Sequence, residues 1–260
     1  MEDKGRKTLD LIELFTEDVN DQYIIHIPHS SVLIPSVEGD SLKKVVYETV
    51  NNELNLLTDW YTDKIFDVVE ISSLVFPYSR LFCDVERLVE DEPLESVGRG
   101  YFYTHTDNGS LLRANNDNKE NIYENYYKPH HNKLLSLVES KLRSNGKVTI
   151  IDCHSFNNQP LKTDLDQNNN RPDICLGVDT YHTNQELIDK VYNLYTSHGY
   201  TVAINSPYVG TIVPLEYYSI NPNVQSIMIE VNKKLYLYDD NSPKVDEIKV
   251  LNSIFRQLFN

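Results

Sequence analysis

The sequence has few cysteines and no long apolar run. Its three cysteines, Cys83, Cys153 and Cys175, lack CxxC spacing, which argues against a disulfide framework and indicates free thiols in a reducing compartment. The N-terminus opens with charged residues, and no unbroken apolar stretch follows that would form a signal sequence or a membrane span. From these absences we expect a soluble cytoplasmic protein.

Positive charge is also scarce. The 260 residues include 24 Lys and Arg against 39 Asp and Glu, a formal net charge of −15. Such a charge argues against nucleic acid and against anionic membrane surfaces as partners. It does not exclude a small anionic substrate, because a few arginines focused in a cleft outweigh distant, screened carboxylates.

The length suffices to bury one sizeable core, and no repeat or linker divides the chain, so we expect a single domain over residues 1–260. Apolar runs typical of strands alternate with segments whose apolar residues recur every three or four positions. Strands are expected at 22–27, 73–77, 100–104, 147–152, 173–178, 200–204 and 225–231, and helices at 41–69 (interrupted near Thr58), 119–144, 184–198 and 243–259. This order predicts an α/β fold with a mostly parallel central sheet and helices on both faces.

Three of the expected strands end at or near residues whose side chains can bind a metal or transfer a proton. His154 ends the run from Ile150, His29 follows the strand that begins near Tyr23, and Glu230 ends the run from Ile227. Because strand ends can converge on one cleft, two imidazoles and a carboxylate at such ends indicate a mononuclear zinc hydrolase. A thiol nucleophile at Cys153 is disfavoured, since neighbours along a strand point to opposite faces.

The third metal ligand is not evident from a motif, because no HExxH sequence is present. Asp59 and Asp63 lie four residues apart and share one face if their segment is helical, so either can face the cleft, with Asp59 preferred. The alternative is that Thr58 caps a helix and that both acids are solvated near its start.

The remaining histidines are interpreted differently. One of the adjacent pair His130 and His131, inside a helical pattern, is expected to hydrogen-bond to a metal ligand. Four others lack a comparable setting and are interpreted as structural or surface residues: His26, His105, His182 and His198.

Arginines supply candidates for binding a substrate carboxylate, because a planar guanidinium suits bidentate contacts. Arg80 and Arg87 lie in an otherwise apolar segment, where a charge needs an ion-pair partner or a functional role, and Arg80 is the preferred candidate. The alternative is a structural ion pair of either arginine with Asp84. Arg113, after a turn at 107–110, is a further candidate.

Ordered motifs along nearly the whole chain resemble the N-formylglutamate amidohydrolase family. They are His-Ile-Pro-His-Ser-Ser at 26–31, Thr-Asp-Trp-Tyr-Thr-Asp at 58–63, Tyr-Ser-Arg-Leu-Phe-Cys-Asp-Val-Glu-Arg at 78–87, Gly-Arg-Gly-Tyr-Phe-Tyr-Thr at 98–104, Tyr-Tyr-Lys-Pro-His-His at 126–131, Asp-Cys-His-Ser-Phe at 152–156, Arg-Pro-Asp-Ile-Cys-Leu-Gly at 171–177, Asn-Ser-Pro-Tyr-Val-Gly-Thr at 205–211 and Ile-Met-Ile-Glu-Val-Asn-Lys at 227–233. The resemblance implies a zinc carboxypeptidase-like (phosphorylase/hydrolase-like) fold. It also implies a metal-dependent hydrolase that removes the formyl group from N-formyl-L-glutamate, a late step of one histidine-degradation route.

Together these observations predict zinc-assisted amide hydrolysis. His29, Asp59 and His154 hold one Zn²⁺ per chain, Glu230 is the general base, and Arg80, Arg87 or Arg113 binds the carboxylate of a small N-acyl amino acid. The alternative for Glu230 is a buried ion pair with Lys233 or Lys234.

Two departures from the family pattern bear on the substrate. Gly210-Thr211 replaces two expected glycines, and Lys233 replaces an expected arginine. A related zinc N-acyl amino-acid deacylase, a carboxypeptidase-like peptidase, or a binding module with a vestigial site are the alternative functions.

Overall fold

The structure is a computed structural model that describes residues 22–37, 40–114 and 118–260. The expected absence of a signal sequence concerns N-terminal residues outside these ranges. Within them, no helix is both long enough and apolar enough to span a membrane.

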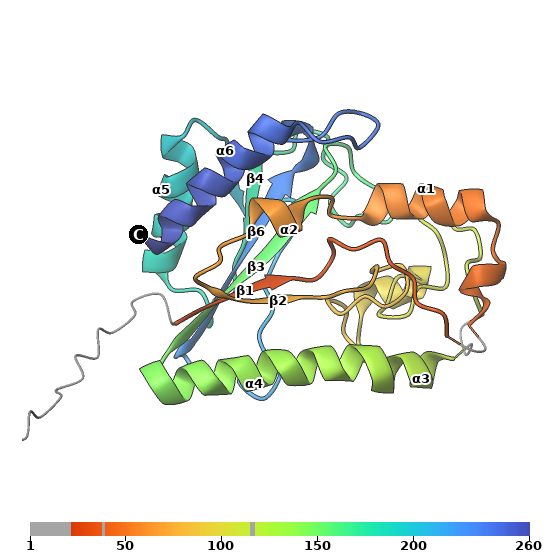
Figure 1. The fold of residues 1–260 in the computed structure, drawn as a ribbon, viewed down its shortest axis with the longest axis horizontal. Helices are drawn as coiled ribbons and strands as arrows, with labels where there is room; N and C mark the ends of the chain where they lie inside the picture. Colours follow the sequence, from red (N-terminus) through yellow and green to blue (C-terminus); the bar gives the residue numbers. More distant parts are fainter. Residues whose placement is uncertain (1–21, 38–39, 115–117) are drawn as a thin grey trace, which may run out of the picture.

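A mixed, mostly parallel sheet forms the centre of the described part (Figure 1). Its six strands lie in the order β2-β1-β3-β6-β4-β5. They are β1 (Tyr23–Ile27), β2 (Ser72–Val75), β3 (Val148–Phe156), β4 (Ile174–Gly177), β5 (Val202–Ile204) and β6 (Val224–Asn232). Only β4 and β6 pair antiparallel; the other paired strands are parallel. The predicted fold class is confirmed.

Helices cover both faces of the sheet (Figure 1). On one face α4 (Lys128–Asn145) packs against Ile24 and Ile150, and on the other α5 (Gln185–Ser197) and α6 (Val245–Arg256) pack against Ile25 and Ile151. This alternation is expected, because successive residues of a strand point to opposite faces. The row of residues on the α4 face continues with His26, Asp152 and His154, whereas Cys153 belongs to the opposite apolar cluster.

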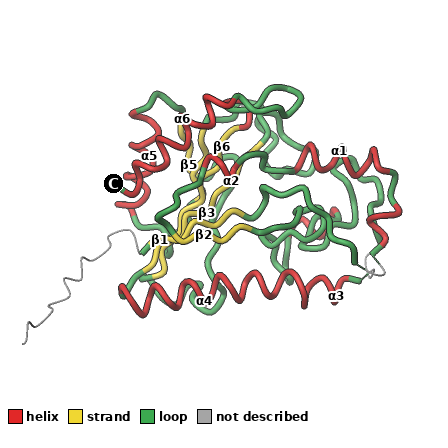
Figure 2. The backbone as a smooth tube through the Cα atoms, in the orientation of Figure 1, coloured by secondary structure: helices red, strands yellow, loops and turns green. Residues whose placement is uncertain are grey.

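The remaining elements are short or lie beyond the sheet. They are η1 (Ser41–Lys44), α1 (Tyr47–Leu57), α2 (Thr62–Ile65), η2 (Pro93–Val97), α3 (Lys119–Ile122), the π-helical η3 (Tyr123–Tyr127), η4 (Lys233–Leu235) and η5 (Gln257–Phe259). The region beyond β1 and β2 is mainly loop (Figure 2). This loop region supplies several of the polar side chains described below.

The prediction of a strand at 100–104 is wrong, because the structure has no strand there. Tyr101, Phe102 and Tyr103 are buried as a strand core would be, but their backbone makes turn and loop hydrogen bonds in place of a strand ladder, such as that from the Asp84 amide to the Tyr101 carbonyl at 2.9 Å. The amides of Thr104 and His105 both donate to the carbonyl of Gly98, at 2.9 and 3.3 Å. Gly98 itself has a φ of 74°, a left-handed conformation that glycine adopts without strain. An apolar aromatic run therefore indicated burial, not strand pairing.

The helix expected at 41–69 is divided. Thr58 follows the last residue of α1 and is its C-cap, so it does not begin a helix. Residues 58–61 have no helical hydrogen-bond ladder, and Tyr61 has a φ of 61°. Asp59 and Asp63 consequently do not share a helix face, and the predicted pairing of the two carboxylates is wrong.

Candidate metal centre and active site

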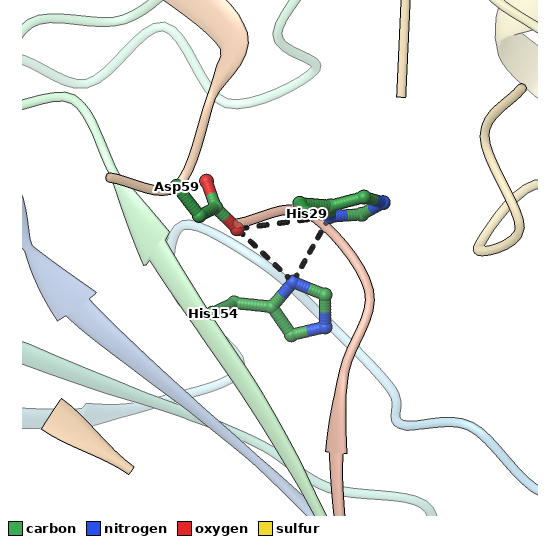
Figure 3. A group of neighbouring side chains, drawn as sticks. All are labelled: His29, Asp59 and His154. Atoms are coloured by element: carbon green, nitrogen blue, oxygen red, sulfur yellow. Dashed lines mark hydrogen bonds and ion pairs between the residues drawn. The ribbon is translucent and has the colours of Figure 1, made fainter. Parts of the chain in front are cut away.

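Three buried side chains from separate segments meet beyond the end of β1 (Figure 3). His29 follows β1, His154 lies on β3, and Asp59 lies in the loop between α1 and α2. The Asp59 amide donates to the His29 carbonyl at 3.0 Å, which fixes this loop against the end of the strand. Their exposed fractions are 2% for His29, 2% for Asp59 and 5% for His154.

The ligand atoms of these residues form a nearly equilateral triangle. His29 Nδ1 lies 3.2 Å from His154 Nδ1, and Asp59 Oδ2 lies 3.6 Å from the former and 3.4 Å from the latter. Ligands that surround Zn²⁺ tetrahedrally at about 2.0–2.1 Å lie about 3.3–3.4 Å apart. Asp59 Oδ2 is buried and accepts no hydrogen bond from a described residue. The donor types and the spacing therefore fit a zinc ion.

Two buried carboxylates orient the two imidazoles. Asp84 Oδ1 lies 2.8 Å from His29 Nε2, and Asp152 Oδ1 lies 3.0 Å from His154 Nε2. A proton on each Nε2 then donates to a carboxylate and leaves Nδ1 unprotonated, the form that binds a metal. We did not predict these roles from the sequence. The spacing of Asp152 and His154, two residues apart on one strand face, was an available signal, whereas Asp84 had none.

Asp59 and the Asp84 carboxylate beside His29 both have lowered pKa values. Burial opposes the ionisation of Asp84, but the charges of Arg80 and His29 hold its pKa well below the ordinary value. Burial opposes the ionisation of Asp59 as well, but the adjacent rings of His154 and His29 lower its pKa. Negative charge thus faces the point where a cation would sit.

Glu230 lies beside His154, because the two are paired in register between β6 and β3. It is 7% exposed, and its Oε2 has no hydrogen-bond partner among the described residues. Burial raises the pKa of Glu230 to about 8, against the opposing charge of His154. The alternative ion pair is not observed within the described ranges, since Lys233 Nζ donates to the Leu56 carbonyl and Lys234 Nζ contacts Asp173.

The three candidate arginines differ in their surroundings. Arg80 donates from Nε and Nη2 to Asp84 Oδ2, at 3.1 and 2.8 Å. Arg87 Nε is 3.7 Å from the same oxygen and has no hydrogen-bond partner among the described residues. Arg113 is 1% exposed, and its guanidinium contacts Asp40 and three backbone carbonyls. The donors of Arg113 are thus engaged by Asp40 and by backbone carbonyls of the loop region.

Asp63 is not part of the metal-ligand group either. It lies in α2, is partly exposed and pairs with Lys64 at 3.1 Å. Of the remaining histidines, His130 bonds to His26 and His131 bonds to the Val85 carbonyl. Neither of this pair contacts a candidate ligand directly.

Solved structures place the fold in a known class. A crystal structure of N-formylglutamate amidohydrolase from Ralstonia eutropha JMP134 is similar with a TM-score of 0.76 and 22% identity, over 92% of this chain and 91% of that one. The structure of a gene product from Agrobacterium tumefaciens is similar with a TM-score of 0.67 and 16% identity, over 94% and 90%. At these identities the likeness establishes the fold alone, an α/β fold shared with an amide hydrolase.

The sequence settles the family. The model of the N-formylglutamate amidohydrolase family matches residues 21–237, and this chain belongs to that family. Family membership makes it a hydrolase of the amidohydrolase type. Among curated proteins, no sequence matches the chain.

Proposed function

We propose that this protein is a zinc-dependent amidohydrolase that cleaves the N-acyl amide of an acidic amino acid such as N-formyl-L-glutamate. One observation supports the chemistry above all others. Three ligand atoms of His29, Asp59 and His154 converge at tetrahedral spacing beside Glu230, a buried carboxylate with an unpartnered oxygen. Family membership supports the substrate class.

The proposed roles follow from the surroundings of each residue. His29, Asp59 and His154 hold the ion, which when bound supplies Lewis-acid chemistry and lowers the pKa of water. Glu230 accepts a proton from the water that attacks the acyl carbon, and it delivers that proton to the amine nitrogen as the C–N bond breaks. Glu230, whose pKa burial raises to about 8, would be ionised more readily beside a bound cation, which favours its role as the base.

Arg87 is the better candidate for binding a substrate carboxylate. Its Nε is unpartnered, whereas Nε and Nη2 of Arg80 are both used by Asp84. The side chains of both arginines are partly exposed, at 28% for Arg87 and 16% for Arg80. Arg80 in this proposal neutralises Asp84, and Arg87 donates to the substrate.

Metal analysis together with substrate comparison tests the proposal. The wild-type chain is expected to bind about one zinc and to release formate from N-formyl-L-glutamate faster than from N-formyl-L-glutamine, which lacks the γ-carboxylate. Asp59→Asn should weaken zinc binding by at least about 100-fold, because a neutral amide replaces a charged ligand. Asp63→Asn, the matched control four residues away, should bind zinc like the wild type.

Three outcomes would contradict parts of this assignment. Equal zinc affinity for the two aspartate variants removes Asp59 from the ligand set. A preference for N-acetyl substrates or short peptides replaces the proposed substrate and keeps the metal chemistry. A wild-type chain that takes up no zinc or other divalent ion overturns the metal-dependent mechanism as a whole.

A further inference from the structure

His26 is a fully buried polar residue in the middle of β1. It is paired in register with Asp152 of β3, whereas Ile24, Ile150 and Leu74 around it on the same sheet face are apolar. A buried imidazole lowers stability unless its nitrogens are hydrogen-bonded. Here Nδ1 lies 2.9 Å from Asp152 Oδ1 and 3.1 Å from Glu86 Oε1, and Nε2 lies 2.8 Å from His130 Nε2. Both ring nitrogens therefore have partners.

Asp152 connects His26 to the candidate metal centre. Its Oδ1 is shared between His26 Nδ1 at 2.9 Å and His154 Nε2 at 3.0 Å. Its Oδ2 accepts from the Ile212 amide at 3.3 Å. Without His26, only His154 and one amide would hold this carboxylate. The carboxylate that orients His154 is thus itself oriented by a histidine from the neighbouring strand.

The hydrogen-bond directions agree with this connection. Burial lowers the pKa of His130 to about 2, so this ring stays neutral and its Nε2 accepts. Burial also acts to lower the pKa of His26, but the hydrogen bond to Asp152 and the nearby carboxylate of Glu86 outweigh it and raise the value to about 9. His26 therefore donates at both nitrogens, one proton to Asp152 and the other to His130.

We propose that His26 is a positioning residue for the candidate metal centre. Held by His130, it fixes Asp152 so that His154 keeps its proton on Nε2 and presents Nδ1 to His29 and Asp59. This inference rests on the proposed function, because it requires His154 to be a metal ligand. It assigns His26 a role that the sequence pattern did not indicate.

Three variants test the proposal by zinc affinity and by the visible absorption of the Co²⁺-substituted protein. His26→Leu removes both donors and should weaken zinc binding about 10–100-fold, the usual effect of losing a group that orients a metal ligand. It should also shift the Co²⁺ bands. His26→Asn retains an amide donor near the Nδ1 position and should recover most of the affinity.

His182→Leu is the matched control. His182 is equally buried but bonds to the Val224 carbonyl and the Ser219 amide, away from Asp152. Its loss should lower stability and leave zinc affinity and the Co²⁺ spectrum unchanged. A folded His26→Leu chain with wild-type affinity and spectrum overturns the inference while the proposed function stands. A wild-type chain that binds no metal overturns both.

Nitrogen NMR of the histidine rings provides a test on the unaltered protein if His26→Leu does not fold. In the zinc-loaded wild type, we expect His26 to be protonated on both nitrogens and His154 on Nε2 alone. An unprotonated Nδ1 on His26 overturns the inference. So does a second zinc per chain, because His26, Glu86 and Asp152 also form a group that is able to hold an ion, and that ion would replace the proton.

Discussion

At the scale of single residues, the site depends on which nitrogen of each imidazole has a carboxylate partner. Asp84 is hydrogen-bonded to Nε2 of His29, and Asp152 to Nε2 of His154. The Nδ1 atoms of both histidines therefore face Asp59. Each carboxylate thereby favours the tautomer with its proton on Nε2. The chemistry therefore depends on residues that make no contact with a bound ion.

Glu230→Gln separates metal binding from turnover. The change keeps the shape of the side chain but removes the proton acceptor, so zinc should stay bound while kcat falls by on the order of 100-fold or more. Zinc content and formate release measured on one preparation check this, with the exposed Glu247→Gln as the control. Turnover that equals the wild type would move the base to another group.

Arg87→Lys and Arg80→Lys should have different effects. Lysine retains the charge but loses the planar fork, so Arg87→Lys should raise KM for N-formyl-L-glutamate by the equivalent of about 1.5–3 kcal/mol. Arg80→Lys should mainly lower the melting temperature, because Asp84 loses one of its two hydrogen bonds from Arg80. Exposed Arg143→Lys should alter neither quantity. If Arg80→Lys alone raises KM, the two arginines exchange roles.

At the scale of elements, strand register brings the functional residues together. The β1–β3 pairing sets His26 beside Asp152, and the β3–β6 pairing sets His154 beside Glu230. The loops then complete the group. Tyr103, from the loop that was expected to be a strand, donates its hydroxyl to Asp84 Oδ2 at 2.6 Å.

Gly98→Ala tests the packing of that loop. A Cβ at this position would lie 2.4 Å from His105 Nδ1 and 2.5 Å from Thr104 Oγ1, and the residue has a φ of 74°. Gly109→Ala is the control, because Gly109 has a similar φ of 84° but no atom within 4 Å of the added Cβ. Both variants incur about 1 kcal/mol of backbone strain, and steric overlap adds to it only at Gly98. Urea unfolding should show a larger loss for Gly98→Ala; equal losses would contradict the tight packing.

At the scale of the whole molecule, a net charge of −15 coexists with a local concentration of cationic side chains. Arg80, Arg87 and the buried Lys233 lie near the acidic site, and burial lowers the pKa of Lys233 to about 8 against the attraction of Asp59. Distant surface carboxylates are screened by salt, whereas buried charges are not. An anionic substrate of the proposed kind would therefore encounter these cationic side chains.

The pH dependence of stability reports on His130. Its pKa falls from 6.5 to about 2 on folding, so its contribution to stability is present above pH 6.5 and is lost as the pH falls below that value. The slope is about 1.4 kcal/mol per pH unit while only the unfolded chain is protonated. In metal-free protein, the stability deficit of His130→Gln should shrink by about 1 kcal/mol between pH 7.5 and 5.5. Urea unfolding at the two pH values measures this, and a deficit independent of pH contradicts it.

The sequence by itself determined the fold class and the two histidines of the candidate group. Alternating apolar periodicities predicted helices over both faces of a parallel sheet, and polar residues at strand ends identified His29, His154 and Glu230, because these signals are local. Family membership, confirmed by the match over residues 21–237, was likewise present in ordered motifs.

Only the tertiary structure decided the positions that depend on loops and on long-range register. Asp59 lies near the histidines because a non-helical loop brings it there, and Arg113 is buried against Asp40 and three backbone carbonyls. The partners of His29 and His26 come from 55 and 126 residues away. No local pattern encodes such pairings, since they arise when packing brings separate segments of the chain into contact.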